Sequence, residues 1–155
     1  MRNNEVTLRP ANESDLSILY EFEQGIINAE RPYDQTLSDG HINYYDLKDF
    51  ISRSDVEVVV AEINDVIVGS GYVKIAMAKA FQSFEKYAYV GFMYVRPSSR
   101  GLGISKLIIN ELKTWAKSKG LNEMRLDVYD QNEIALKAYE RVGFKKLLVE
   151  MRMDI

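Results

Sequence analysis

Two runs of β-branched residues in the middle of the chain most restrict the folds open to it. Residues 56–63 and 66–75 both have the pattern of strands, and only Asn64 and Asp65 separate them. Asn and Asp tolerate the positive φ angles of a tight hairpin turn, which favours an antiparallel pair. A third strand pattern covers residues 87–95. The centre of the chain is therefore expected to form three antiparallel strands.

Strand and helix patterns alternate on both sides of this region. Before it, residues 5–9 are expected to form a short strand, and a helical pattern begins at Asn12. Residues 25–40 have no period, which predicts a loop or a broken helix, followed by a short helix at 44–52. After the third strand, we expect a helix from Ile104 to Gly120, a strand at 124–129, a helix at 132–142 and a last strand at 146–155.

Composition narrows the class of protein. The chain has 155 residues with 46% hydrophobic and 28% charged residues, as expected for one domain over residues 1–155. Its net charge of -3 makes a nucleic-acid partner unexpected. It has no cysteine, which excludes a disulfide framework, a thiolate zinc site and a cysteine nucleophile. No apolar run predicts a signal peptide or a membrane span, so a cytoplasmic location without membrane association is expected.

A glycine-containing turn joins the third strand to the next helix. Residues 95–106 read V-R-P-S-S-R-G-L-G-I-S-K. Small residues let backbone amides approach a ligand, and a helix N-terminus favours a phosphate. Gly101 and Gly103 are too close for a Walker A loop, and Lys106 stands where a dinucleotide-binding fingerprint needs its third glycine. The turn is thus read as an anion cradle, with a purely structural tight turn as the alternative.

A second segment, residues 132–144, reads N-E-I-A-L-K-A-Y-E-R-V-G-F. Together with R-G-L-G-I-S at 100–105, it resembles the GNAT superfamily of N-acetyltransferases. The two segments match that family's R-x-x-G-x-[GA] and N-x-x-A-x-x-x-Y-x-x-x-G-F motifs, except that Ser105 replaces the usual Gly or Ala. The resemblance covers essentially the whole chain. It implies a mixed α+β fold with a mostly antiparallel sheet of six to seven strands and about four helices.

The resemblance also implies an activity: direct transfer of an acetyl group from acetyl-CoA to a primary amine of a small molecule, amino acid derivative or peptide, without a metal. The bulged end of the third strand would bind the thioester and pantetheine through backbone amides, the glycine turn would bind the pyrophosphate, and Asn132 would contact the pantetheine arm. The expected cofactor-binding residues are Phe92, Met93, Tyr94, Val95, Arg100, Gly101, Leu102, Gly103, Ile104, Ser105, Asn132 and Tyr139.

Tyr139 is the candidate acid for the departing thiolate, because a phenol with a pKa of roughly 10 can protonate a thiolate whose conjugate acid has a pKa of roughly 8.5. Without the resemblance, Tyr139 would be read as a core residue of an apolar helix face, and Asn132 as a helix cap.

The general base is less defined, because the strand before the turn contains no acid. Glu30 and Glu85 are candidate catalytic bases, and Asp127 or His41 could also serve. Each also has an ordinary reading as a surface or loop residue.

The acceptor side is expected to be acidic and aromatic. Between residues 21 and 49, acids greatly outnumber bases, and Tyr33, Tyr44 and Tyr45 lie among them. Such a wall would attract a cationic amine. The expected acceptor-binding residues are Glu30, Tyr33 and His41 of this segment, together with Asp127 on the strand expected at 124–129. The segment also contains Glu21, Glu23 and Asp34. A non-catalytic acyl-CoA sensor or an interaction domain remains the alternative function, and a homodimer is compatible with the resemblance.

Overall fold

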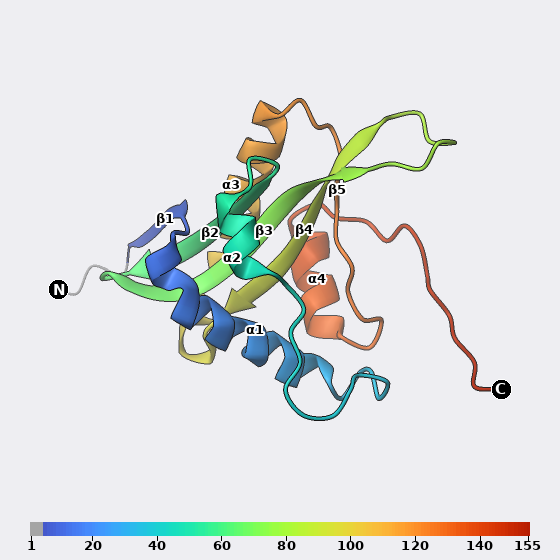
Figure 1. Ribbon diagram of the computed structural model, residues 1–155, viewed down its shortest axis with the longest axis horizontal. Helices are drawn as coiled ribbons and strands as arrows, with labels where there is room; N and C mark the ends of the chain where they lie inside the picture. The colour runs from blue at the N-terminus through green and yellow to red at the C-terminus, as the bar shows by residue number, and fades with distance from the viewer. Residues whose placement is uncertain (1–4) are drawn as a thin grey trace.

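A five-stranded sheet forms the centre of the computed structural model, which describes residues 5–155 (Figure 1). The strands follow the order β1-β2-β3-β4-β5, and each neighbouring pair is antiparallel except β4 and β5. Asn64 and Asp65 have φ angles of 51° and 63°, which confirms the expected hairpin turn between β2 and β3. The strands are β1 (Val6–Pro10), β2 (Val56–Ile63), β3 (Val66–Met77), β4 (Lys86–Val95) and β5 (Met124–Arg125).

Helices cover both faces of this sheet (Figure 1). Alternate residues of β2 point to opposite faces, as the strand period of two requires. Val58 and Val60 pack in a core with Leu19 of α1, whereas Val59 packs with Ile108 of α3 in a second core. The helical segments are η1 (Glu13–Asp15), α1 (Leu16–Glu30), α2 (Leu47–Ser52), η2 (Pro97–Ser99), α3 (Ile104–Ser118) and α4 (Glu133–Arg141).

Helix α1 is longer than its sequence pattern indicates. The loop expected from residue 25 begins only after Glu30, so that prediction is wrong for residues 25–30. A Cβ atom on Gly25 would lie 2.7 Å from Cε2 of Tyr94, so this glycine leaves room for the ring. The Tyr94 ring in turn packs on Phe22, with centroids 4.6 Å apart. Packing against β4 thus offsets the roughly 1 kcal/mol that a glycine costs inside a helix.

The sheet has five strands, not the expected six to seven. The strand expected at 124–129 is reduced to Met124–Arg125, and residues 146–155 are extended but form no strand. A strand is defined by a paired neighbour, and β5 pairs only with β4. Both corrections therefore concern the same side of the sheet.

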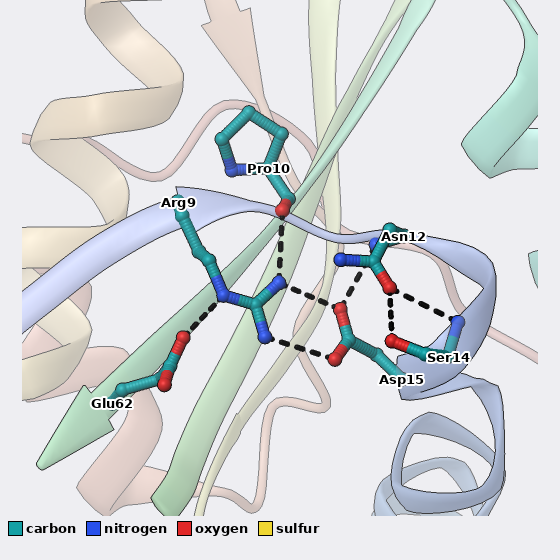
Figure 2. A network of polar contacts seen from close by, with 6 residues as sticks. All are labelled: Arg9, Pro10, Asn12, Ser14, Asp15 and Glu62. Carbon is teal, nitrogen blue, oxygen red and sulfur yellow. Dashed lines mark hydrogen bonds and ion pairs between the residues drawn. The ribbon is translucent and has the colours of Figure 1, made fainter. Parts of the chain in front are cut away.

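A polar network fixes the start of α1 against the sheet (Figure 2). Arg9 donates to both carboxylate oxygens of Asp15, at 2.8 and 2.9 Å, and also to Glu62 on β2. Asp15 and Asn12 form a capping box at the start of the helical region. The hydrogen bond and charge of Arg9 lower the pKa of Asp15, and the two carboxylates raise that of Arg9. The network sets the direction in which α1 crosses the sheet, and so positions Glu30 at its other end.

Candidate active site

The glycine turn between β4 and α3 leaves backbone amides available at the start of a 15-residue helix. Gly101 and Gly103 have φ angles of 82° and 75°, a left-handed conformation that favours glycine. Gly103 is the N-cap residue and supplies no side-chain acceptor to the first turn. The first-turn amides and the helix dipole therefore form a site suited to an anion.

Side chains around this turn divide into buried and exposed ones. Ile104 is only 2% exposed, so it can contribute to an anion site only through its amide. Leu102 and Lys106 are exposed. Arg100 donates from Nε to the Val95 carbonyl at 3.2 Å, which ties the turn back to the end of β4. Ser105 is half-buried on the first turn of α3.

Strand β4 has the expected irregularity before the turn. Its register with β3 shifts between Ser70 and Tyr72, and Phe92 has a φ angle of 55°. The Phe92 side chain is 1% exposed, and its carbonyl accepts a hydrogen bond from Ser70 Oγ at 3.1 Å. Phe92 can thus meet a ligand only through its backbone.

The outer edge of β4 is open beyond this region. β4 pairs with β5 only at Ala88 and Tyr89, so within residues 5–155 no strand covers its edge from residue 90 onward. An open strand edge presents unpaired amides and carbonyls. The 3-10 helix η2 separates this edge from the glycine turn, and the amides of Arg96, Ser99 and Arg100 donate to backbone carbonyls. The edge and the turn are therefore two separate groups of backbone donors.

Tyr139 lies on α4 and is partly buried. Its ring contacts Phe144, with centroids 5.9 Å apart. Burial, with a smaller contribution from the charge of Glu30, raises the pKa of Tyr139 to about 12. The phenol therefore stays protonated at neutral pH and can donate a proton. Asn132 caps α4 by accepting from the Ala135 amide at 3.2 Å, which confirms its capping role; a contact with pantetheine stays a prediction.

Glu30 belongs to a group of acids and tyrosines that we call the acidic tyrosine cluster. Burial raises the pKa of Glu30, the charge of Asp34 adds to this effect, and the Tyr44 hydroxyl opposes it. The Tyr44 hydroxyl faces Glu30 but is buried without a hydrogen bond of good geometry among residues 5–155. The cluster consists of Glu30, Tyr33, Asp34, Tyr44, Tyr129 and Tyr139.

Asp34 joins three parts of the chain within this cluster. It accepts from Tyr129 Oη at 3.1 Å and from Arg152 Nη1 at 2.9 Å. The pKa of Asp34 lies well below its usual range, because Thr36 donates to it through its hydroxyl and its amide and Arg152 adds a further hydrogen bond. Tyr33 stacks on Tyr129, with centroids 5.9 Å apart. The loop after α1, the segment before α4 and the C-terminal residues therefore meet at Asp34.

The remaining expected site residues, Glu85, Asp127 and His41, have other immediate neighbours. Glu85 precedes β4, seven residues and roughly 23 Å of extended chain before Phe92. It borders a different hollow, beside residues 119–123. Asp127 is exposed and accepts from Tyr89 Oη at 2.8 Å. His41 lines a hollow of about 540 Å³ together with Tyr20, Gln24, Asn43, Tyr45, Asp46 and Leu47.

Glu23 has a role that the sequence pattern did not indicate. It was expected in the acidic wall, but its side chain is fully buried. Its Oε2 accepts from the backbone amides of Tyr44 and Tyr45, at 2.9 and 2.8 Å, while Oε1 has no hydrogen-bond partner among residues 5–155. Glu23 and Glu30 are seven residues apart and so lie on one face of α1. Their spacing was the sequence signal that could have placed Glu23 on the same helix face as Glu30.

Residues 5–155 contain no group of three or more His, Asp or Glu side chains arranged to hold a metal ion. None of the helices in this part of the chain is both long and apolar enough to cross a membrane.

The chain is similar to a known protein family and to solved structures that share its fold. Residues 24–144 match the family model described as the acetyltransferase (GNAT) family. A tetramutant of the BH1408 protein from Bacillus halodurans has 18% identity and a TM-score of 0.85, over 96% of this chain and 99% of that one. A predicted acetyltransferase from Clostridium acetobutylicum, solved with acetyl-CoA, has 18% identity and a TM-score of 0.70, over 97% and 96%. The aminoglycoside N-acetyltransferase AAC(6')-Iy, in complex with CoA, has 18% identity and a TM-score of 0.72, over 96% and 100%.

Proposed function

Since the chain belongs to the GNAT family of acetyltransferases, we propose that it transfers the acetyl group of acetyl-CoA directly to a primary amine. The acceptor would be a small molecule, an amino acid derivative or a peptide. The observation that carries the proposal is the open edge of β4 leading into the uncapped start of α3, with Tyr139 and Glu30 on neighbouring elements. The similar folds solved with acetyl-CoA and with CoA support this choice of cosubstrate.

The available donors fit the chemical groups of acetyl-CoA. The pyrophosphate needs several N–H donors and a positive potential, which residues 101–105 offer through their backbone and the α3 dipole. The pantetheine arm contains amides that pair with a strand edge, as residues 92–95 offer beyond β5. The same amides would hold the thioester carbonyl oxygen as negative charge develops on it. The Ser105 hydroxyl adds one further donor at the phosphates.

Tyr139 is the proposed acid. Acetyl transfer forms a bond from the amine nitrogen to the acetyl carbon and breaks the bond from that carbon to sulfur, so the departing thiolate needs a proton. A phenol with a pKa of about 12 carries its proton at every pH at which the reaction would be measured. A positioned phenol within hydrogen-bond reach of the sulfur can deliver it.

Glu30 is the proposed base, in preference to Glu85. An alkylamine with a pKa of roughly 10.4 is neutral in only about one molecule per thousand at pH 7, so it must lose a proton before it can attack. Glu30 influences the pKa of Tyr139 directly, and burial makes its own carboxylate more basic than usual. Glu85 lies before β4, beside the hollow at residues 119–123.

The acidic tyrosine cluster supports a cationic acceptor. Glu30 supplies a negative charge, Asp34 shares its charge with Arg152, and Tyr33 and Tyr129 supply stacked aromatic faces. Carboxylates and aromatic faces together attract an alkylammonium group. A bisubstrate analogue containing acetylneamine is bound by AAC(6')-Iy, which is consistent with an amine acceptor on this fold.

The first test is calorimetric titration with acetyl-CoA, with NAD as the control ligand. We expect saturable binding of acetyl-CoA at a Kd of roughly 1 to 100 μM, about -5.5 to -8 kcal/mol, and none of NAD. An amine screen then follows CoA release with a thiol reagent, which has no protein background because the chain lacks cysteine. No heat with acetyl-CoA would overturn the proposal.

Tyr139→Phe separates an enzyme from a sensor that binds acyl-CoA without turnover. We expect kcat to fall about 10²- to 10⁴-fold, the usual contribution of a general acid, with the Kd for acetyl-CoA nearly unchanged. Tyr20→Phe is the matched control, because Tyr20 is exposed on α1 and lies outside the acidic tyrosine cluster. If Tyr139→Phe turned over as fast as the control, Tyr139 would not be the general acid.

A further inference from the structure

Tyr44 carries a buried hydroxyl without a well-aligned partner. Its Oη makes no hydrogen bond of good geometry among residues 5–155. Buried polar atoms in native proteins are nearly always paired, so an unpaired buried hydroxyl needs an explanation. After burial itself, Glu30 has the largest influence on this hydroxyl, through a side-chain hydrogen bond and through its charge. The Tyr44 hydroxyl therefore lies within reach of the proposed base, with an alignment that leaves room to improve.

The backbone of Tyr44 is held in place by a second acid of α1. Glu23 is fully buried, and its Oε2 accepts from the amides of Tyr44 at 2.9 Å and of Tyr45 at 2.8 Å. Glu23 and Glu30 lie on one face of α1, seven residues apart. Glu23 thus fixes the main chain of residue 44 on the same helix face from which Glu30 projects.

Tyr45 connects the same segment to the bulge of β4. Its ring lies edge-on to the rings of Tyr72 and Phe92, with centroids 5.5 and 5.4 Å away. Phe92 has the positive φ angle that marks the bulge, next to the amides proposed to hold the thioester. Because Tyr44 directly precedes Tyr45, its position is fixed relative both to α1 and to β4.

We propose that Tyr44 is a positioning residue for acetyl transfer, whose hydroxyl orients the Glu30 carboxylate toward the acceptor amine. This inference rests on the proposed function, in which Glu30 is the base. Hydrogen bonds of catalytic groups are often poorly aligned without substrate and tighten in the complex. The Tyr44 hydroxyl donates to one carboxylate oxygen of Glu30, and the other oxygen takes the proton of the acceptor ammonium. Tyr44 keeps its own proton throughout.

Tyr44 differs from the other titratable groups within electrostatic reach of Glu30. Burial raises the pKa of Glu30, the hydrogen bond of Tyr44 lowers it, and the charge of Asp34 raises it. The three other tyrosines have a raised pKa for which burial is the largest cause and the charge of Glu30 a smaller one. Loss of the Tyr44 hydroxyl should therefore raise the pKa of Glu30. The groups in reach besides Tyr44 are Asp34, Tyr45, Tyr129 and Tyr139.

The test follows the Glu30 carboxyl carbon by NMR titration of the full chain, with Glu30→Gln identifying its resonance. In Tyr44→Phe, we expect the proton affinity of Glu30 to rise about threefold to tenfold, which is what one hydrogen bond is usually worth. The low-pH limb of kcat/KM should move to higher pH by the same factor. The plateau value of kcat should fall about tenfold or more, because the base is no longer aligned. Tyr20→Phe is the matched control, because Tyr20 is exposed on the same helix, and it should change neither quantity.

Variants of Glu23 test the same positioning from the backbone side. Glu23→Ala removes the acceptor of the Tyr44 amide, so its pH profile should shift in the same direction as that of Tyr44→Phe. Glu23→Gln keeps an oxygen that can accept from this amide, so it should restore the wild-type pH profile. A merely structural role of Glu23 would lower stability without moving the profile.

Three results would overturn the proposal. An unchanged proton affinity of Glu30 in Tyr44→Phe would mean that the hydroxyl does not bind this carboxylate. A raised proton affinity with unchanged kcat and pH profile would mean that the contact has no part in the reaction. A wild-type chain that acetylates no amine would overturn the role together with the proposed function. The NMR titration distinguishes this last failure from the first, because it reports on the contact without turnover.

Discussion

Replacing Glu23 tests whether its buried carboxylate stabilises the fold by holding residues 44 and 45 against α1. In Glu23→Ala, the amides of Tyr44 and Tyr45 lose their acceptor. Each buried donor left unpaired costs about 1–3 kcal/mol, while removal of the unpartnered Oε1 returns part of this. We expect a net loss of about 3 kcal/mol in the free energy of unfolding. For a chain of this length, that corresponds to a fall in Tm of roughly 6–12 °C.

Two companion variants make the measurement specific. Glu23→Gln keeps an oxygen that can accept from both amides, so its loss should be about 1 kcal/mol. Glu21→Ala removes an acid on the same helix whose side chain is 65% exposed and lies 3.4 Å from Arg96, and such an ion pair is worth less than about 1 kcal/mol. Urea unfolding at pH 7 measures all three. A Glu23→Ala loss no larger than that of Glu21→Ala would refute the reasoning.

Three further predictions concern the turn, the helix and the polar network. Gly103→Ala and Gly120→Ala each place a Cβ atom at a positive φ angle, so each should lower the free energy of unfolding in urea by about 1–2 kcal/mol. Only Gly103→Ala should also raise the Kd for acetyl-CoA, by at least tenfold in calorimetry. Equal Kd values for the two variants would argue against the anion site. Gly25→Ala should destabilise the chain by about 1–3 kcal/mol because its Cβ meets the Tyr94 ring, and a loss of the same size in a Tyr94→Ala background would contradict this. Folding lowers the pKa of Asp15, so the stability that its carboxylate contributes is present above a pH of about 3.8 and is lost as the pH falls further. Asp15→Asn should therefore lower the free energy of unfolding by about 1.5–3 kcal/mol at pH 7 and by much less near pH 2.5. An equal loss at both pH values would show that the charge of Asp15 does not contribute to stability.

Local patterns were enough to predict the elements whose partners are close in sequence. The β2–β3 hairpin follows from two β-branched runs and the turn preference of Asn64 and Asp65, all within twenty residues. The start of α4 follows from the capping residue Asn132. The helix after the glycine turn follows from its apolar period.

Elements that depend on distant partners were not predictable in the same way. Gly25 reads as a helix breaker, and only the ring of Tyr94, on another element, explains why the helix continues through it. Glu23 reads as a surface acid until the backbone of Tyr44 and Tyr45 is brought against it. The 146–155 pattern is typical of a strand, yet no neighbour within the described chain pairs with it. For Gly25 and Glu23 the decisive contact lies about twenty residues or more away along the chain.

The preference of Glu30 over Glu85 also came from three-dimensional placement. Both are single acids near expected elements, and their sequence contexts do not rank them. The fold separates Glu85 from the end of β4 by the length of a strand and brings Glu30 within electrostatic reach of Tyr139.

The Arg9–Asp15–Glu62 network has a consequence for how this molecule can diversify. It anchors α1 at its first turn, far from the loop of residues 31–46 that follows the helix. Residues 31–43 of that loop can therefore change without touching this anchor, whereas Tyr45 packs on Phe92 of β4, with ring centroids 5.4 Å apart. The first part of the loop can thus vary in sequence while the anchor of α1 and the contact of Tyr45 with β4 both stay in place.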